Sequence, residues 1–290
     1  MNAKQKEKGG GLIDLKKKSL WRRLKENKVA QGVSSVLLPV LFGVLILALW
    51  QGQVLHKIFN TDTNTLPLPS RICHIIIDNI PAFAQNALYT LLVAVIGLVI
   101  GSIIGYLIAV FAATFQKWGK GGLTIVGAFN AIPIVALAPV MTNWTKDISN
   151  DPNIRSMFAK TLVVMIVCIA SMSINAFRGL TELKPFALDL MKSYAAKKST
   201  VFFKLRLPNS IPYVFTALRV SVPISIISAV VSEYFAEYIV GVGREIRENI
   251  VLGQYPTAWA YIVVACLIGL VMYGVLMLVE SIVLKNRKVK

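Results

Sequence analysis

Length, composition and charge exclude an ordinary soluble domain. The chain has 290 residues, of which 56% are hydrophobic and 16% charged, and its mean hydropathy is +0.65; a soluble domain carries about a quarter charged residues. The net charge of +17 would fit nucleic-acid binding only if the charges gathered on one face of a soluble fold. They lie instead between apolar runs, which favours topology signals and attraction to anionic membrane lipid, with no nucleic-acid partner.

Residues 1–33 predict a basic cytoplasmic leader. We expect a flexible join at residues 9–11 and a surface helix at about residues 12–24. The apolar run that follows is long enough to span a membrane and has no small-residue cleavage site, so a removable signal is not expected. Residues 34–284 are expected to form a domain of six membrane spans, and residues 285–290 a basic cytoplasmic tail.

Six apolar runs predict an all-α, polytopic membrane protein, because a bilayer core about 30 Å thick needs about 20 mainly apolar residues per helix. The runs cover about residues 34–50, 86–115, 123–144, 158–177, 211–234 and 259–284. Asn130, Pro133 and Pro139 interrupt the third run. Proline within a span is tolerated where neighbouring helices or water satisfy the freed carbonyls, so we expect this helix inside the bundle.

The distribution of lysine and arginine predicts the orientation. Twenty-three of the 31 basic residues lie in the leader, in residues 116–122, in residues 178–208 and in the tail, whereas six lie in the other three loops. Basic residues are in excess in cytoplasmic loops. We therefore expect a multi-pass membrane protein with both termini and residues 178–208 in the cytoplasm.

Residues that could carry catalysis or bind a metal are few. The two histidines, His56 and His74, have no acidic or cysteine cluster beside them, and the three cysteines, Cys73, Cys168 and Cys266, fit no metal spacing. The sequence contains neither a glycine-rich phosphate loop nor a Gly-x-Ser-x-Gly elbow. We expect a non-catalytic membrane protein that itself binds no cofactor and no metal.

Three glycines form a ladder in the second run. Gly97, Gly101 and Gly105 recur every four residues, which places them on one helix face and allows a second helix to approach closely. The ladder serves either close packing within the chain or contact with another subunit.

Two charges lie in the fifth run. Arg219 is in its first half and Glu233 is near its outer end, about 21 Å apart along a helix, so they cannot pair directly. Arg219 is close enough to the cytoplasmic end to reach the headgroups. Glu233 is expected either at the outer mouth of a pathway or as the cap of a neighbouring helix.

Residues 183–208 form a basic, amphipathic segment between two apolar runs. The pattern predicts one helix from near Pro185 to Ala195 and, after a bend, a second helix with Ser199 as its N-cap that ends at Pro208. Apolar side chains flanked by lysines on two short helices suit a groove on another protein. The alternative is a helix that lies flat on anionic lipid.

The spacing within this segment is specific. The segment ends in Leu207-Pro208. Ala195 lies 12 residues before Leu207, and the triplet Asp189-Leu190-Met191 begins six residues before Ala195. This arrangement resembles the signature of the membrane subunits of binding-protein-dependent ABC importers: Glu-Ala-Ala, three residues, Gly, about nine residues, then hydrophobic-x-Leu-Pro. The acid, the spacing and the final Leu-Pro match, whereas Leu190, Met191 and Ala195 depart from it. The resemblance implies that the following residues couple the chain to an ATPase: Asp189, Leu190, Met191, Ala195, Ala196, Leu207 and Pro208.

Further motifs extend the resemblance over about residues 66–284. They are Leu66-Pro-Leu-Pro-Ser70, Asn86-Ala-Leu-Tyr-Thr-Leu91, Asn130-Ala-Ile-Pro-Ile-Val-Ala-Leu-Ala-Pro139 and Val230-Val-Ser-Glu233. Their order and spacing are similar to those of the nitrate/sulfonate/taurine-type subfamily.

The resemblance implies a six-span permease with the type I ABC importer fold. A second permease copy, identical or related, would complete the path, a separate ABC ATPase would bind ATP and Mg, and an extracytoplasmic substrate-binding protein would deliver the substrate. The third and fifth spans would line the path, with these candidate residues: Asn130, Thr216, Ser221, Ser225, Ser228 and Glu233. The outer segment from Glu237 to Gly253 is expected to shape the docking surface for the binding protein. The substrate would be a small anion (nitrate, sulfonate or taurine) or a vitamin or its precursor (a thiamine-precursor pyrimidine or riboflavin).

Two other classes of protein are weighed against this one. An ion-gradient-driven secondary transporter is expected to have ionisable residues at mid-membrane and repeated halves, and neither is evident in the sequence. A membrane scaffold without transport activity would have no associated ATPase.

Overall fold

The computed structural model describes residues 28–235 and 240–285, and within these ranges its regular structure is entirely helical. The chain divides into two compact units, Met1–Thr61 and Asp62–Lys290. The predicted leader helix at residues 12–24 and most of the predicted tail lie outside the described residues.

The described part of the first unit consists of two helices, α2 (Lys28–Gln51) and α3 (Val54–Phe59). The helix predicted at residues 34–50 is therefore confirmed. Its described apolar part, Leu37–Gln51, is shorter than the about 20 residues that cross a bilayer core. Between the two helices Gln53 adopts a left-handed conformation with φ of 59°, which turns the chain.

Four helices of the second unit are long and apolar enough to cross a membrane, among the residues described. They are α5 (Ile80–Thr114), α8 (Pro152–Thr181), α11 (Leu207–Phe235) and α13 (Tyr255–Leu284). Helices of about 30 residues reach about 45 Å at 1.5 Å per residue, which exceeds the bilayer core. The helices predicted for the second, fourth, fifth and sixth runs are thereby confirmed, and each begins several residues earlier than predicted.

The third run is not the single helix that the hydropathy predicted. It divides into α6 (Gln116–Ala128), a 3-10 turn (Phe129–Ala131) and α7 (Ile134–Trp144). Pro133 causes the division, because a residue before proline is driven to extended backbone and Ile132 has φ of −73° and ψ of 122°. The predicted loop at residues 116–122 is also wrong, since α6 starts there, directly after α5.

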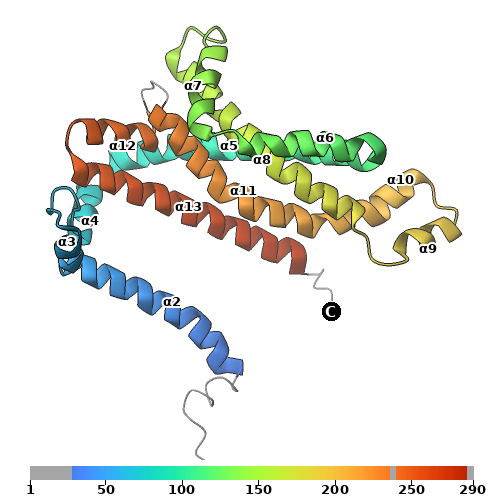
Figure 1. Ribbon diagram of the computed structural model, residues 1–290, viewed down its shortest axis with the longest axis horizontal. Helices are drawn as coiled ribbons and strands as arrows, with labels where there is room; N and C mark the ends of the chain where they lie inside the picture. Colours follow the sequence, from blue (N-terminus) through green and yellow to red (C-terminus); the bar gives the residue numbers. More distant parts are fainter. Residues whose placement is uncertain (1–27, 236–239, 286–290) are drawn as a thin grey trace, which may run out of the picture. The chain divides into compact units, whose positions relative to one another are not determined.

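The glycine ladder lets α5 and α8 pack closely along their lengths (Figure 1). A Cβ atom added to Gly97, Gly101 or Gly105 would lie 2.6 to 2.7 Å from an atom of α8, which no real side chain tolerates. The sequence predicts that these glycines serve either close packing within the chain or contact with another subunit. The structure shows packing within the chain. Small residues continue this close contact to α11, where Ala217 joins Ala109 and Ala176 in one buried cluster.

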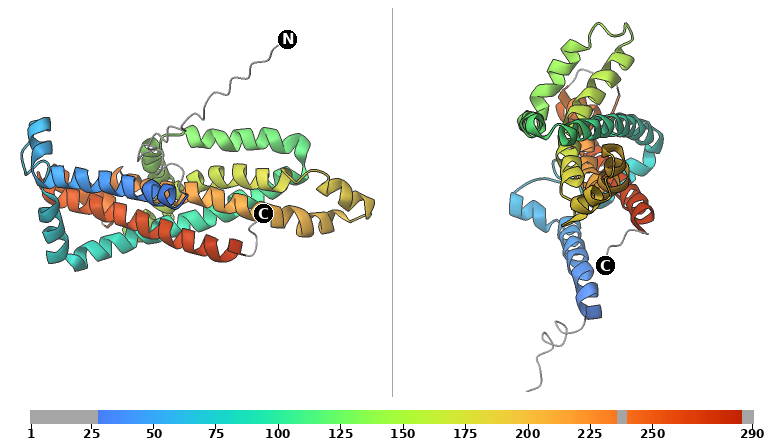
Figure 2. Two further views of the ribbon diagram at one scale, coloured as in Figure 1. Left: turned by 90° about the horizontal axis from the view of Figure 1, so that it is seen from below. Right: turned by 90° about the vertical axis from the view of Figure 1, so that its right-hand side faces the viewer.

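Short helices stand at the two ends of the second unit. Figures 1 and 2 show α9 (Ala187–Ser193) and α10 (Lys198–Val201) at one end, beyond the last residues of α8. The other end carries α4 (Pro69–Asp78) and α12 (Val242–Val251), beside the first residues of α5 and α13. The sites described below lie at these two ends.

Replacing Gly101 by alanine is expected to lower the free energy of unfolding by about 1–3 kcal/mol, the range for overpacking a tight contact. The new Cβ would lie 2.6 Å from the Met165 carbonyl oxygen. Thermal unfolding of the purified protein in detergent measures the effect. Gly274 in α13 is the control, because a Cβ there meets no atom within 4 Å; alanine should stabilise by about 0.5–1 kcal/mol through helix propensity. Equal effects at both positions would contradict the packing role.

Candidate functional site: a docking segment and a capped outer helix

The segment after α8 folds into two short helices, as predicted, but its second helix does not end at Pro208. The chain passes from α10 through a π-helical stretch, Phe202–Arg206, directly into α11. Pro208 lacks the N–H that an α-helix needs at this point, and the wider π turn before it accommodates the missing bond. The residue before α10 is Lys197, so the N-cap predicted at Ser199 is also wrong; Ser199 lies inside the helix.

The bend after α9 is a Schellman motif. The amide of Ala196 donates to the carbonyl of Met191 at 3.0 Å, and the amide of Ala195 donates to that of Lys192 at 2.8 Å. This motif requires a left-handed residue, usually glycine, directly after the helix, and Ala195 has φ of 48°. Ala195 stands at the glycine position of the signature. Its Cβ makes the left-handed conformation energetically unfavourable, so the backbone is strained at this bend.

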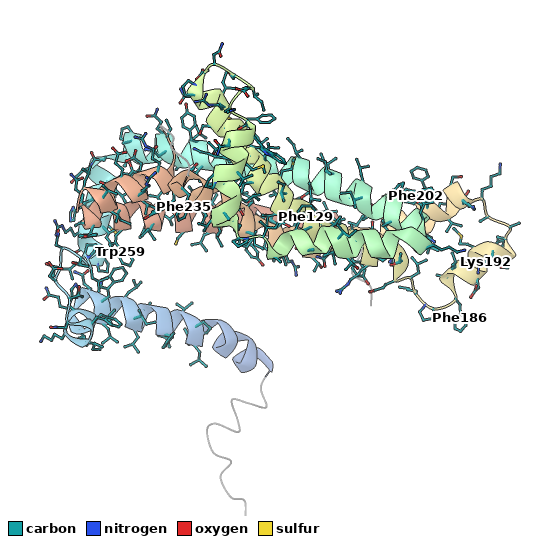
Figure 3. All side chains as sticks on the ribbon, turned by 45° about the horizontal axis from the view of Figure 1, so that its top comes forward. Phe129, Phe186, Lys192, Phe202, Phe235 and Trp259 are labelled. Atoms are coloured by element: carbon teal, nitrogen blue, oxygen red, sulfur yellow. The ribbon has the colours of Figure 1, made fainter. Side chains whose placement is uncertain are left out.

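Large apolar side chains are exposed on this docking segment, which we define as residues 186–206. Phe186 is 82% exposed, Leu190 59%, Tyr194 78% and Phe203 64%. Figure 3 shows Phe186 and Lys192 at the tip of the segment, away from the long helices. Further exposed lysines flank the apolar residues: Lys192, Lys197, Lys198 and Lys204. Exposed apolar side chains surrounded by lysines are typical of a surface that binds another protein.

The other predicted coupling residues lie in or beside this segment. Asp189 is exposed and forms an ion pair with Lys192 at 3.1 Å, which contributes little at such exposure. Met191 and Ala196 are half-buried, and Leu207 and Pro208 are half-buried in the first turn of α11. The structure therefore brings residues 189–191 and the bend at Ala195 together at the outer end of the docking segment. Leu207 and Pro208 lie where this segment joins α11.

At the other end, the first turn of α12 is buried and its amides are satisfied by side chains from two other helices. Gly241 N–H donates to Asn86 Oδ1 at 3.0 Å, Val242 N–H to Thr90 Oγ1 at 2.9 Å, and Gly243 N–H to Glu233 Oε2 at 2.9 Å. Free amides at a helix start need such acceptors when water is excluded. We call this arrangement the α12 cap.

Glu233 is the centre of the α12 cap. Its side chain is fully buried, and it also accepts from Thr90 Oγ1 at 2.8 Å. Lys160 of α8 lies 3.8 Å from Glu233 Oε1 and donates to the Val240 carbonyl at 3.1 Å. Of the two alternatives for Glu233, the geometry is that of a helix cap. The sequence pattern did not predict that Lys160 lies beside Glu233. A lone lysine inside an apolar run could have indicated a buried acidic partner.

The glycines of the α12 cap leave no room for a side chain. Gly241 has φ of 132°, and a Cβ on it would lie 2.3 Å from the Glu233 carboxyl carbon. A Cβ on Gly243 would lie 2.0 Å from the Val230 carbonyl oxygen. The Gly-Val-Gly sequence is therefore required for α12 to approach α11.

Arg219 forms a bidentate ion pair with Glu280 of α13. Its Nε donates to Glu280 Oε2 at 2.8 Å, and its second guanidinium nitrogen donates to Oε1. The side chain of Arg219 is 44% exposed and that of Glu280 10%. Sequence reasoning expected Arg219 to reach the headgroups and missed Glu280, the only acid in the last apolar run.

The residues predicted to line a path differ in where the structure places them. Thr216 is exposed. Four others, Ser221, Ser225, Ser228 and Glu233, are at most 1% exposed because they point into the contacts of α11 with neighbouring helices, so they face no open path in this chain. Asn130 lies in the 3-10 turn between α6 and α7, and its side chain is outside the described part.

Replacing Ala195 by glycine is expected to stabilise the docking segment by about 0.5–1 kcal/mol, because glycine takes the left-handed conformation without the Cβ penalty. Hydrogen exchange of the Ala196 amide and thermal unfolding measure the change. Ala196→Gly is the control: Ala196 has no positive φ, so glycine there only adds unfolded-state entropy and should destabilise. A destabilising effect at Ala195 would rule out strain at the bend.

Glu233→Gln is expected to destabilise the protein by about 3 kcal/mol, because it removes the negative charge beside the buried Lys160 ammonium. Glutamine still offers a carbonyl oxygen to the Gly243 amide, so the loss reports on the charge. Thermal unfolding of Glu233→Gln, Lys160→Met and the double variant forms a cycle. We expect the double variant to be more stable than the two single losses predict; simple additivity within about 0.5 kcal/mol would show that the charges are not coupled.

Comparison with known proteins extends these observations. The formylaminopyrimidine transport permease protein ThiX of Halalkalibacterium halodurans is 24% identical over 253 residues, which cover 86% of this chain and 96% of the relative. The riboflavin transport system permease protein RibX of Chloroflexus aurantiacus is 25% identical, over 58% of this chain and 60% of the relative. A bicarbonate transport system permease protein, CmpB of Synechocystis, is 26% identical over 29% of this chain and 30% of the relative.

Solved structures share the fold. The crystal structure of an amino acid ABC transporter aligns with a TM-score of 0.58 at 14% identity, covering 71% of this chain and 96% of that one. The inward-facing methionine ABC transporter MetNI aligns with a TM-score of 0.53 at 15% identity, covering 71% and 94%. At these identities the likeness shows the fold, the type I importer permease fold expected from the sequence.

The family model that matches describes a binding-protein-dependent transport system inner membrane component and covers residues 101–285. This match includes more than half of the chain and contains the docking segment, α12 with Glu233, and the Arg219–Glu280 pair. The chain therefore belongs to the binding-protein-dependent transport system inner membrane component family, the membrane-spanning permeases of ABC importers.

Proposed function

We propose that this chain, together with a second permease copy, forms the translocation path of an ABC importer and is driven by a separate ATPase that docks on residues 186–206. The observation that carries the proposal is the exposure of Phe186, Leu190 and Tyr194 on a segment whose bend falls at the glycine position of the coupling signature. The chain has no phosphate loop, so ATP and Mg are bound by the partner, and this subunit is non-catalytic.

A continuous helical stretch connects the docking segment to the α12 cap. α10, the π-helical stretch and α11 run without interruption from Lys198 to Phe235, 38 residues, or about 55 Å at the α-helical rise. Glu233, near the far end of this stretch, holds the first turn of α12. A displacement imposed by the ATPase at α10 would therefore reach α12 through one continuous helical element.

The path is proposed to run along exposed faces of α7 and α11. Thr216 is the predicted polar residue that α11 exposes, and Asn130 marks the break before α7. The exposed part of α12, together with the segment up to Gly253, is proposed to meet the extracytoplasmic binding protein, since α12 stands at the end opposite the docking segment.

The orientation is proposed from charge. The docking end carries the lysines of residues 186–206, and basic residues are retained in the cytoplasm. The chain is accordingly placed in the bacterial cytoplasmic membrane as a multi-pass protein with both termini in the cytoplasm.

For the substrate, we favour an uncharged heterocyclic vitamin or vitamin precursor over a small anion. Arg219 would be the obvious partner for an anion on α11, but its guanidinium already forms two hydrogen bonds with the Glu280 carboxylate. The relative named for formylaminopyrimidine transport aligns over most of the chain, whereas the one named for bicarbonate transport aligns over less than a third. An ion-gradient-driven mechanism has no corresponding support.

Replacing Leu190 and Tyr194 by aspartate is expected to weaken ATPase binding at least tenfold, because truncating or charging a buried apolar anchor of an interface costs about 2 kcal/mol or more. Uptake should fall in proportion, while the amount of protein in the membrane stays the same. Co-purification of the ATPase and ATP-dependent uptake of labelled formylaminopyrimidine, riboflavin and bicarbonate are the measurements.

Lys197→Asn provides the matched control, since Lys197 is exposed on the same segment but is not an apolar anchor. Normal ATPase co-purification in the Leu190/Tyr194 variant would overturn the docking proposal. Uptake of bicarbonate in preference to both heterocycles would overturn the substrate proposal and leave the docking proposal intact.

A further inference from the structure

A cleft of about 520 Å³ lies between α6 and α8 near the end of α8 that leads into the docking segment. We call it the α6–α8 cleft. Its lining residues are Leu123, Thr124, Gly127, Ile174, Phe177, Arg178, Thr181 and Glu182. The volume is within the range of ligand-binding pockets, and neither the docking segment nor the α12 cap includes it.

The cleft combines apolar walls with two charged side chains, those of Arg178 and Glu182. Leu123, Ile174 and Phe177 supply the walls. The guanidinium of Arg178 is exposed, and within the described residues it forms no hydrogen bond or ion pair. Glu182, one turn further, is the acidic residue of the cleft, and its Oε2 accepts a hydrogen bond from the Tyr213 hydroxyl at 3.4 Å.

The position of Arg178 matches the level of the lipid headgroups. It lies in the last turn of α8, a spanning helix that ends at Thr181, and the proposed orientation puts this end at the cytoplasmic leaflet. That leaflet carries anionic lipids, and basic pockets between spanning helices on this side bind their headgroups. Acyl chains match apolar walls, which a soluble anion would not use.

We propose that the α6–α8 cleft is a binding site for one anionic phospholipid, with its phosphate on Arg178 and an acyl chain along Leu123, Ile174 and Phe177. Such a lipid sits at the base of the docking segment, where α8 ends and the chain turns toward α9. The proposal rests on the proposed orientation of the chain, but it does not depend on the ATPase or on the substrate.

The test is native mass spectrometry of the purified full-length protein with added palmitoyl-oleoyl phosphatidylglycerol or the zwitterionic phosphatidylcholine with the same chains. The wild-type protein should retain phosphatidylglycerol preferentially. Arg178→Gln should weaken phosphatidylglycerol binding about fivefold, the effect of one basic residue at a membrane surface, and leave phosphatidylcholine binding unchanged.

Lys184→Gln is the matched control, because Lys184 is an exposed cation six residues further along the chain that does not line the cleft. An equal loss in both variants would mean that net charge alone attracts the lipid, and would overturn the site. Competition by inorganic phosphate at equal concentration would make it a site for a soluble anion, and would also overturn the proposal.

A second variant tests the apolar half of the cleft. A Cβ at Gly127 would meet only Ile174 Cδ1, at 3.4 Å, so Gly127→Leu is chosen to place a side chain in the cleft; an unchanged melting temperature verifies that the fold is kept. It should reduce the binding of both lipids. If it instead dissociates a dimer and leaves lipid binding unchanged, the cleft is a contact between two copies of the chain, and the lipid proposal fails.

Loss of this site and loss of the proposed transport function can be told apart. Failure of phosphatidylglycerol to bind, with ATPase co-purification intact, overturns only the lipid site. Failure of the ATPase to co-purify, with selective lipid binding intact, overturns only the docking proposal.

Discussion

Backbone amides and carbonyls that leave water must be paired within the protein, and this requirement shapes the chain at every level. It makes the long apolar runs helical, and it divides the third run where Pro133 forces extended backbone on Ile132. It closes α9 with the Schellman bonds around Ala195. At the start of α12, three consecutive amides are buried because Asn86, Thr90 and Glu233 accept their hydrogen bonds.

The same requirement governs the charges inside the bundle. Glu233 is fully buried and is surrounded by two hydrogen-bond donors and the Lys160 ammonium, and Arg219 is matched by Glu280. Charges in a spanning segment are costly unless they are paired or reach water. Outside the bundle, exposed lysines lie on the docking segment: Lys192, Lys197, Lys198 and Lys204.

Close helix packing then connects the two ends of the molecule. The glycine ladder holds α5 against α8, and small residues extend this contact to α11. The stretch from Lys198 to Phe235 carries the docking segment at one end and the α12 cap at the other. The proposed coupling between ATPase and path therefore depends on one long helix that is tightly packed along its middle.

The sequence by itself determined the fold class, the long helices and the docking segment, because hydropathy, proline position and residue spacing are local properties of the chain. It also indicated Asn130–Pro133 as a break, although not that α6 would begin at Gln116. Local pattern placed the end of the second short helix at Pro208, where a π turn lets the helix continue. Only the tertiary structure decided that Glu233 caps α12 beside Lys160, that Arg219 pairs with Glu280, and that Ser221, Ser225 and Ser228 are buried. The partners in each of these contacts are far apart in the sequence or lie on faces that its pattern does not distinguish, so they are assigned only when the helices pack.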